Sequence, residues 1–349
     1  MNPKYLELFK ELEQDRIANK NTTKNSRILI LDGLNTFIRV FSAVPALNDD
    51  GQHIGGVAGF LKSVAAAIRQ HKPTRCIIVF DGKGGSRRRK DLYPDYKANR
   101  ANKTAFNRHQ EFASLQDEQE SMKFQYGRLI QYLQLLPVTL LAIDQVEADD
   151  VIAYIANEIY TDAEHQAIIY STDRDFLQLV NDRISVYSPI KKKLYTPDVM
   201  REEFGFDTKN YLLYRAFTGD VSDNIPGVSG VGGKSLIKHF PMFSGNEQIS
   251  VDDVIAYAAA ATGKYKVFER VRISEDVLRR NYQLMQLKEV DMSGQIKSVV
   301  RDIVTNDINR MNVFEFKKMF MADKMYTTIK DLDTWLPSSF NTLNTYTSL

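Results

Sequence analysis

The chain has 349 residues, of which 43% are hydrophobic and 26% are charged, and its formal net charge is +2 at pH 7. This composition is ordinary for a folded globular protein and excludes a largely disordered chain, while the length allows one large domain or two modest ones. The single cysteine, Cys76, excludes an internal disulfide and argues against a zinc site built from cysteines.

The start of the chain predicts a short helix and a linker. Residues 3–19 predict an amphipathic helix because Leu6, Phe9 and Leu12 recur at helical spacing, and the polar residues 20–26 predict the linker. Acids and bases alternate here, so the segment does not resemble a signal peptide. No uninterrupted apolar run approaches the length of a membrane span, and we therefore expect no contact with a membrane.

Short apolar runs typical of buried strands come next, with stretches of helical character such as 57–70 and 149–160 between them. The apolar runs cover residues 28–31, 75–80, 138–143 and 167–170. Strands that alternate with helices predict an α/β fold with a central, parallel-rich sheet flanked by helices. Ligands of such sheets bind at the carboxyl ends of the strands.

Other parts of the chain have a different character. Between Lys83 and Arg108 there are nine Lys or Arg and two acids, so we expect residues 83–125 to form an exposed, helical segment. From about residue 190, helical stretches flank a Gly-rich segment. Beyond residue 290 the pattern is uninformative, and the polar residues 338–349 are expected to be loose.

Nine carboxylates stand out because they follow predicted strands, open the helix at 149–160 or precede the Gly-rich segment. They are Asp32, Asp81, Glu147, Asp149, Asp150, Asp173, Asp175, Asp220 and Asp223. Clustered carboxylates repel one another and raise their pKa values, and hard divalent cations relieve that repulsion. No His lies among them, which favours Mg²⁺ or Mn²⁺ over zinc. Two such ions could stabilise both the attacking and the leaving oxygen of a phosphodiester.

Each of these acids also has a plain structural explanation. Asp before Gly is common in turns, and acids in the first turn of a helix are common caps. The metal interpretation is favoured because the acids recur at matching ends of successive strands, provided that those strands are neighbours in one sheet.

A basic run at residues 87–90 (RRRK) precedes a second segment, 93–100, that combines tyrosines with cations. Lysine and arginine neutralise phosphates, and tyrosine stacks on unpaired bases. A basic run is more often a solvated face, but the acidic strand end at Asp81 nearby favours a nucleic-acid contact. The candidate DNA contacts are Arg87, Arg88, Arg89 and Lys90, and the candidate catalytic residues are Tyr96, Lys97 and Arg100.

The Gly-rich segment 227–235 (GVSGVGGKS) does not match a nucleotide-binding loop. A P-loop would need Gly where Val228 stands, and the dinucleotide fingerprint would need Gly or Ala where Ser235 stands. We expect a hairpin between two helices whose backbone N–H groups grip a DNA phosphate, the alternative being a plain helix connection. The candidate contacts are Gly227, Gly230, Gly232, Gly233 and Lys234.

Several motifs together resemble the 5′-nuclease or flap endonuclease family, which includes the 5′ nuclease domain of bacterial DNA polymerase I and free-standing phage enzymes. The resemblance covers roughly residues 26–240. Its most specific motifs are residues 92–100 (LYPDYKANR), 147–150 (EADD), 171–176 (STDRDF) and 219–228 (GDVSDNIPGV), in the order of the family. Residues 80–93 are one residue longer than the polymerase-I-type pattern, which leaves open which arginine of the basic run matches.

The resemblance implies an organisation of the chain. A resolvase-like (PIN) nuclease core would occupy residues 26–190, with a helical arch at 83–125. A helix–hairpin–helix region for DNA binding would follow at 191–290. Residues 1–25 would be an N-terminal extension, and residues 291–349 a C-terminal segment.

The resemblance also implies roles for the site residues. By position, Asp32, Asp81, Glu147, Asp149, Asp150 and Asp173 match the carboxylates nearer the first metal ion. Asp175, Asp220 and Asp223 match those nearer the second, and Tyr96, Lys97 and Arg100 match the residues of the arch. The ions would be two Mg²⁺, for which Mn²⁺ substitutes, with K⁺ at the helix–hairpin–helix.

The activity implied is that of a structure-specific 5′ nuclease in DNA replication or repair, both a 5′-3′ exonuclease and a flap endonuclease. Removal of RNA primers by an RNase H activity is included. The substrates would be branched or 5′-flap DNA and RNA–DNA hybrids, and the partners a sliding clamp or a single-strand-binding protein. The protein would be a cytoplasmic monomer of a bacterial or phage-infected cell.

Two other functions remain open. One is a non-catalytic binder of DNA junctions, which the complete set of acids disfavours. The other is a compact metal-dependent ribonuclease for single-stranded RNA, which the Gly-rich hairpin and the basic run disfavour. A nucleotide-dependent kinase or ATPase is excluded with the P-loop.

Overall fold

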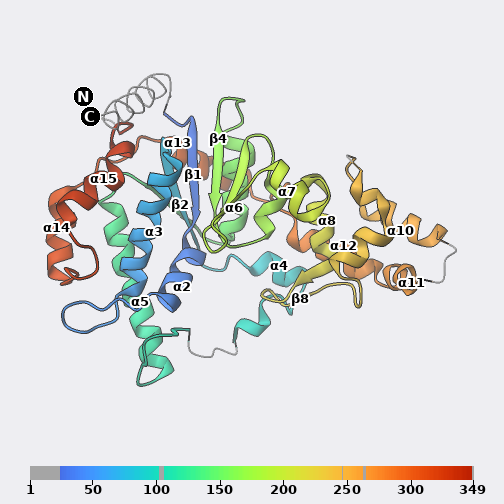
Figure 1. The fold of residues 1–349 in the computed structure, drawn as a ribbon, viewed down its shortest axis with the longest axis horizontal. Coiled ribbons are helices and arrows are strands. Elements are labelled where there is room, and N and C mark those ends of the chain that lie inside the picture. Colours follow the sequence, from blue (N-terminus) through green and yellow to red (C-terminus); the bar gives the residue numbers. More distant parts are fainter. Residues whose placement is uncertain (1–23, 102–105, 246, 262–264, 348–349) are drawn as a thin grey trace, which may run out of the picture.

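A single six-stranded sheet organises the fold. The structure is a computed structural model that describes residues 24–101, 106–245, 247–261 and 265–347. The strands are β1 (Arg27–Asp32), β2 (Arg75–Asp81), β3 (Thr139–Ile143), β4 (Gln166–Tyr170), β5 (Ile184–Ser188) and β6 (Lys193–Tyr195), in the order β3-β2-β1-β4-β5-β6 (Figure 1). All pairs are parallel except β5 with β6. The predicted α/β fold is confirmed, and the helix predicted at 3–19 lies outside the described residues.

Strand β1 shows why the sheet is buried on both faces. Side chains alternate along a strand, so Ile28 and Ile30 lie in one hydrophobic cluster and Leu29 and Leu31 in another. The first face is covered by α6 (Ala148–Tyr154) and η2 (Ile155–Ile159), and the second by α2 (Gly33–Ala43), α3 (Gly55–His71) and α5 (Leu115–Gln134). A layer of helices on each face is the arrangement that a parallel sheet requires.

The cluster on the first face continues into a helical region. This region contains α7 (Pro197–Phe204), η4 (Thr208–Asn210), α8 (Tyr211–Thr218), α9 (Gly233–His239), η5 (Pro241–Ser244), α10 (Val251–Ala260), α11 (Lys266–Ile273) and α12 (Glu275–Met285). Figure 1 shows α10 and α11 at the end of the molecule opposite α14 and α15. Because Ile28, Phe217 and Val254 belong to one cluster, no separate core marks the predicted boundary at residue 190, which stays a prediction.

The C-terminal helices return to the sheet. They are α13 (Gly294–Thr305), α14 (Val313–Ala322) and α15 (Leu332–Asn344). The expectation of a loose end at 338–349 is wrong for the residues of α15, because Leu336, Phe340 and Leu343 form a fully buried stripe at helical spacing. Arg69 on α3 also donates a hydrogen bond of 2.6 Å to the Ser339 hydroxyl.

The segment predicted as an exposed arch contains α4 (Arg87–Leu92), η1 (Ala98–Ala101) and the start of α5. In Figure 1, α4 and the start of α5 lie below the sheet, on the side where β1 ends. The return of this segment to the core is fixed by Glu118, which accepts hydrogen bonds from the backbone of Phe106 and Asn107 at 2.8 and 2.5 Å. Within the described ranges, no helix has the length and apolar character needed to cross a membrane.

Candidate active site

Four of the predicted acids meet at the carboxyl edge of the sheet. Asp32 ends β1, Asp81 ends β2, and Asp173 lies shortly after the end of β4. Since β1 pairs with both β2 and β4, these strands are neighbours, as the metal interpretation required. Asp149 lies in the first turn of α6, and α6 is tied to the same edge because the Ala148 amide donates a hydrogen bond of 2.9 Å to Asp81 Oδ1.

Burial and mutual repulsion make Asp32, Asp149 and Asp173 hard to ionise together. Burial, with the charges of Asp173 and Asp81, raises the pKa of Asp32 to about 7. Burial and the charges of Asp173 and Asp32 raise the pKa of Asp149 well above its usual value. The pKa of Asp173 is raised by burial and then by Asp223 and Asp220. A cation placed among them would remove this repulsion.

Asp32 also has the structural role that the sequence allowed as an alternative. Its Oδ1 accepts a hydrogen bond of 3.1 Å from the Asn35 amide and caps α2, while the Ser171 hydroxyl donates to Oδ2 at 3.1 Å. Capping orients the carboxylate and leaves further lone pairs on both oxygens. The capping role and a metal-binding role are therefore compatible.

A second group of acids is gathered around Arg215 on α8. Asp175 opens η3 (Asp175–Leu179), and Asp220 lies in β7 (Gly219–Asp220), which pairs with β8 (Ile225–Pro226). Arg215 Nε donates to Asp175 Oδ1 at 2.7 Å and Nη2 to Asp220 Oδ2 at 2.5 Å. Burial and Asp173 still raise the pKa of Asp175 to about 7, whereas Ser222 and Arg215 lower the pKa of Asp220 against the effect of burial.

A third group consists of Glu147 and Asp150, which Arg89 on α4 holds. Arg89 donates to Asp150 at 2.8 and 2.7 Å, also contacts Glu147, and donates to the Leu284 carbonyl at 2.9 Å. All three side chains of this group are buried. Burial opposes ionisation of Glu147, but the charges of Arg89 and Lys97 hold its pKa below the usual range.

Two of the predicted arch residues, Tyr96 and Lys97, contact Glu147 of this third group. Lys97 Nζ is 2.6 Å from Glu147 Oε1 and 4.0 Å from Asp223 Oδ2. The Tyr96 hydroxyl lies 3.2 Å from Glu147 Oε2 and 3.3 Å from Asp223 Oδ2, and the ring is 3% exposed, so it is not available for stacking on a base in this conformation. Arg100 lies in η1, but its side chain is outside the described residues.

The basic run does not form one surface. The side chains of Arg87 and Lys90 are exposed, whereas Arg88 is half-buried, with one guanidinium nitrogen 3.6 Å from Asp291. Arg89 is 5% exposed and is fully engaged with the protein, so the prediction that it contacts DNA is not supported. The sequence alone did not indicate which of the four cations is buried, because the acids that pair with Arg89 lie far from it in the chain.

The acids of the first group fit a hard divalent cation. Within the described residues, no three His, Cys, Asp or Glu side chains are already grouped tightly enough to hold one ion. Mg²⁺ needs only one or two direct carboxylates and keeps several waters, so a looser group of oxygens suits it. None of the ion pairs among the described residues involves Asp32, Asp81, Asp149 or Asp173, which leaves their charge for an external cation.

The Gly-rich segment forms the connection between two helices that the sequence predicted. It runs from α8 through β7 and β8 to α9, with Gly232 as the N-cap. Gly230 has φ +69°, and its carbonyl accepts a hydrogen bond of 2.9 Å from Arg270 on α11. A Cβ at Gly233 would lie 2.4 Å from the Tyr214 hydroxyl, so this glycine permits close packing of α9 on α8. Lys234 is exposed.

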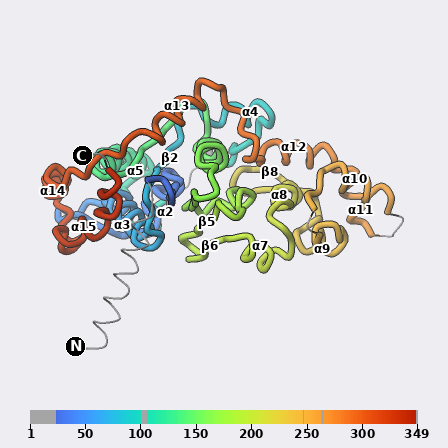
Figure 2. The backbone as a smooth tube through the Cα atoms, turned by 90° about the horizontal axis from the view of Figure 1, so that it is seen from above, coloured from blue at the N-terminus to red at the C-terminus, as the bar shows by residue number. Residues whose placement is uncertain are grey.

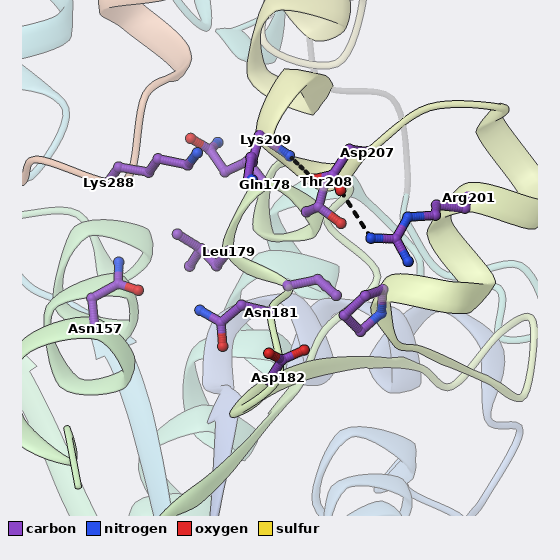
Figure 3. A pocket seen from close by; sticks show the side chains of 12 residues that line it. Asn157, Gln178, Leu179, Asn181, Asp182, Arg201, Asp207, Thr208, Lys209 and Lys288 are labelled. Atoms are coloured by element: carbon purple, nitrogen blue, oxygen red, sulfur yellow. Dashed lines mark hydrogen bonds and ion pairs between the residues drawn. The ribbon is translucent and has the colours of Figure 1, made fainter. Parts of the chain in front are cut away.

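The pocket in Figure 3 is separate from the acids. It has a volume of about 500 Å³ and is lined by Asn157, Asn181, Arg201, Lys209 and Lys288, among others. None of the nine acids lines it, so it is not part of the candidate active site.

The sequence reasoning missed Arg215, the cation that forms ion pairs with Asp175 and Asp220 in the second group. The only signal was its position, a single cation in the otherwise uncharged helix 211–218 (YLLYRAFT), a few residues before Asp220. A lone charge among residues that are mostly apolar indicates a buried ion pair, because an unpaired buried charge would be too costly.

Comparison with known proteins identifies the kind of protein that this chain resembles. A family model described as 5′-3′ exonuclease, N-terminal resolvase-like domain, matches residues 27–205. A 5′-3′ exonuclease of Aquifex aeolicus is 28% identical over 309 residues, which cover 88% of this chain and 95% of that protein. DNA polymerase I of Bacillus subtilis is 30% identical over 239 residues, which cover 66% of this chain but 25% of the polymerase.

Solved structures share the fold. The flap endonuclease D15 of bacteriophage T5, in a complex with DNA and metal ions, has a TM-score of 0.62 at 23% identity, with 85% of this chain and 97% of that chain covered. The T5 5′-exonuclease with bound zinc ions has a TM-score of 0.60 at 22% identity, with 87% and 100% covered. At these identities the likeness concerns the fold.

Proposed function

This chain belongs to the family of 5′-3′ exonucleases with a resolvase-like N-terminal domain, and on that premise we propose that it is a divalent-metal-dependent, structure-specific 5′ nuclease. It hydrolyses phosphodiester bonds in branched or 5′-flap DNA, and RNA–DNA primers belong to its substrates. The observation that carries the proposal is the edge of the sheet where Asp32, Asp81, Asp149 and Asp173 gather, none of them in an ion pair with a Lys or Arg of the described part of the chain. That arrangement destabilises the protein unless a ligand compensates it.

The metal ions would be Mg²⁺, with Mn²⁺ as a substitute. Asp32, Asp81, Asp149 and Asp173 would hold the first ion, and Asp175, Asp220 and Asp223 face the second position. When bound, such ions lower the pKa of a coordinated water and stabilise the charge on the phosphate. Glu147 and Asp150 are engaged by Arg89, and we assign them to positioning the site.

Lys97 is the cation that this chain offers to the scissile phosphate. Its ammonium lies between Glu147 and Asp223, at the acidic edge, and Lys97 belongs to the segment predicted as the arch. Burial works against its charge, but Glu147 and Asp223 raise the pKa of Lys97, so it is protonated at neutral pH. A phosphate bound there replaces the carboxylates as its partner, and Arg100, three residues later, would extend the same contact.

DNA would be gripped through its backbone. Arg87 and Lys90 are exposed on α4, and the connection between α8 and α9 presents Gly-rich backbone with Lys234 beside it. Contacts of this kind position a duplex without reading its sequence.

Residues 26–190 would form the nuclease core and 191–290 the DNA-binding region, with K⁺ at the hairpin. The protein would act as a monomer in DNA replication or repair. Its partner would be a sliding clamp or a single-strand-binding protein.

A labelled 5′-flap duplex and a single-stranded control, each in Mg²⁺ and in EDTA, test the activity. We expect cleavage near the junction of the flap by the wild-type protein and by Asp182→Asn, a variant at an exposed acid away from the edge. Asp173→Ala and EDTA should each abolish cleavage. Binding of the flap without cleavage in Mg²⁺ and in Mn²⁺ would overturn the enzyme assignment and leave a junction-binding protein.

A further inference from the structure

The hairpin of β5 and β6 places an exposed isoleucine beside the acidic edge. Strand β5 runs parallel to β4, so the end of β5 and the turn after it lie at the same edge of the sheet as Asp173. Figure 2 shows β5 and β6 side by side. The turn consists of residues 189–192, between Ser188 and Lys193, which pair in the register. Ile190 in this turn is 68% exposed, and Lys192 beside it has φ +51° and is also exposed.

The turn is held firmly, which distinguishes Ile190 from an ordinary exposed side chain. Glu203 on α7 accepts hydrogen bonds from Lys191 at 3.0 Å, Lys193 at 2.8 Å and the Tyr195 hydroxyl at 3.3 Å. These contacts tie the turn and strand β6 to α7. They also neutralise much of the charge of two lysines, so the tip is not a general basic patch for a DNA duplex.

A small pocket lies between this turn and the acids. Its volume is about 220 Å³, and its walls include Thr172, Asp173, Arg174, Ser188 and Ile190. Pockets for whole small-molecule ligands measure about 300–1,000 Å³, so this one accepts a fragment of a ligand, of the size of one nucleobase or one sugar. Because Asp173 is part of its wall, whatever fills the pocket lies next to the bond that is cut.

We propose that this pocket holds the base of the single unpaired nucleotide next to the scissile phosphate, with Ile190 packed against that base. Apolar side chains such as isoleucine serve as wedges against bases in other DNA-binding proteins, because they replace the stacking that an opened base step loses. Arg174 also lines the pocket and is exposed, so its guanidinium is available to a phosphate of that nucleotide. The site thereby fixes which phosphate reaches the acids. The inference rests on the proposed nuclease function and concerns its choice of the bond.

The occupancy can be measured without catalysis. A 5′-flap duplex carries 2-aminopurine at the unpaired position next to the junction, and a second duplex carries it within the paired region. Binding in EDTA is followed by anisotropy and by the fluorescence of the 2-aminopurine. Ile190→Ala removes the apolar contact, while Ile273→Ala removes an isoleucine of similar exposure, 79%, on α11. Both positions are exposed, so both variants should fold.

We expect binding to change the fluorescence at the junction position in the wild type and in Ile273→Ala, and to change it much less in Ile190→Ala. Affinity for the flap should fall about three- to ten-fold in Ile190→Ala, as for the loss of one apolar contact. In Mg²⁺, the same variant should spread its cuts over adjacent phosphates. Equal fluorescence and identical cleavage positions in the two variants would overturn the inference and leave the nuclease proposal intact. A wild type that binds but never cuts would overturn the nuclease proposal, and the fluorescence would still decide whether the pocket is filled.

Discussion

The guanidinium of Arg89 donates to both carboxylate oxygens of Asp150, at 2.8 and 2.7 Å, between side chains that are 5% and 9% exposed. The pair joins α4, which lies at the start of the predicted arch, to α6, which carries Asp149. A two-point contact fixes the orientation of the arginine as well as its distance. The start of the arch is therefore held in a set position over the acidic edge before DNA arrives.

Replacing Arg89 by Ala should destabilise the protein severely. Removing one partner of a buried ion pair leaves an uncompensated buried charge and costs about 3–5 kcal/mol. Here Asp150 loses its guanidinium and Glu147 loses one of its two cations. Arg87→Ala, on the same helix but exposed, should change the free energy of unfolding by less than about 0.5 kcal/mol. Urea unfolding of both variants measures this, and equal stability of the two would refute the structural role of Arg89.

Asp173→Asn should stabilise the metal-free protein while it abolishes cleavage. The neutral amide removes repulsion from Asp220 and Asp223, and its oxygen can still accept the hydrogen bond from the Asp175 amide, now 2.8 Å long. We expect a gain on the order of 1 kcal/mol in EDTA at neutral pH. Mg²⁺ should then raise the melting temperature of the wild type more than that of the variant, since only binding to the folded state stabilises it.

Thermal unfolding of both proteins in EDTA and in Mg²⁺ is the measurement. A variant that melts below the wild type in EDTA would show that the carboxylates do not repel one another in the folded protein. Asp182→Asn, at an exposed acid, is the control for the substitution itself.

Much of the site could be predicted from the sequence because strand ends are local features. Asp32 and Asp81 each follow an unbroken apolar run, and the geometry of a parallel sheet then brings such positions to one edge. The order of the strands could not be derived from the sequence. The prediction required only that the strands ending in these acids be neighbours, and β1 does pair with both β2 and β4. The Gly-rich connection was predicted from another local feature, the helical stretches on either side of it.

What the sequence did not show is how the protein balances these charges. Arg89 looked like Arg87 and Arg88, because the feature that distinguishes it is Asp150, more than 60 positions away in the chain. Arg215 depends in the same way on Asp175, 40 positions away in the chain. Such contacts are set by the tertiary arrangement, and a single sequence carries no periodic signal for them. Helix α15 is a different case, because Leu336, Phe340 and Leu343 do recur at helical spacing among polar residues.

Gly227→Ala should destabilise the connection between α8 and α9. A Cβ at this position would lie 2.4 Å from the carbonyl oxygen of Phe217 and 2.6 Å from the carbonyl carbon of Thr218. Both are backbone atoms, so the clash can be relieved only by moving the connection, at a cost of about 1–3 kcal/mol. Gly127→Ala supplies the opposite case, because a Cβ there meets nothing within 4 Å on the exposed side of α5.

Alanine at position 127 should raise the free energy of unfolding by about 0.5–1 kcal/mol, since it favours the helix over glycine. Chemical denaturation should therefore show that the free energy of unfolding rises in Gly127→Ala and falls in Gly227→Ala. A Gly227→Ala protein as stable as the wild type, with unchanged affinity for a DNA duplex, would show that the connection tolerates a side chain there.

Glu203→Gln should loosen the β5–β6 hairpin in a manner that depends on pH. Burial acts against ionisation, but the hydrogen bonds from Lys193, Lys191 and Tyr195 lower the pKa of Glu203 to about 2, compared with 4.5 for an ordinary glutamate. A carboxyl whose pKa is lowered on folding stabilises the protein above the pKa of the unfolded state, and the contribution disappears as the pH falls from 4.5 towards 2. The variant should thus be less stable than the wild type at pH 7, and the difference should shrink steadily below about pH 4.5. Glu202→Gln, at the exposed neighbour on α7, provides the matched control in urea unfolding at several pH values. A deficit that stays constant down to the acid transition would mean that the carboxylate charge does not hold the hairpin, and the firm presentation of Ile190 would then need another cause.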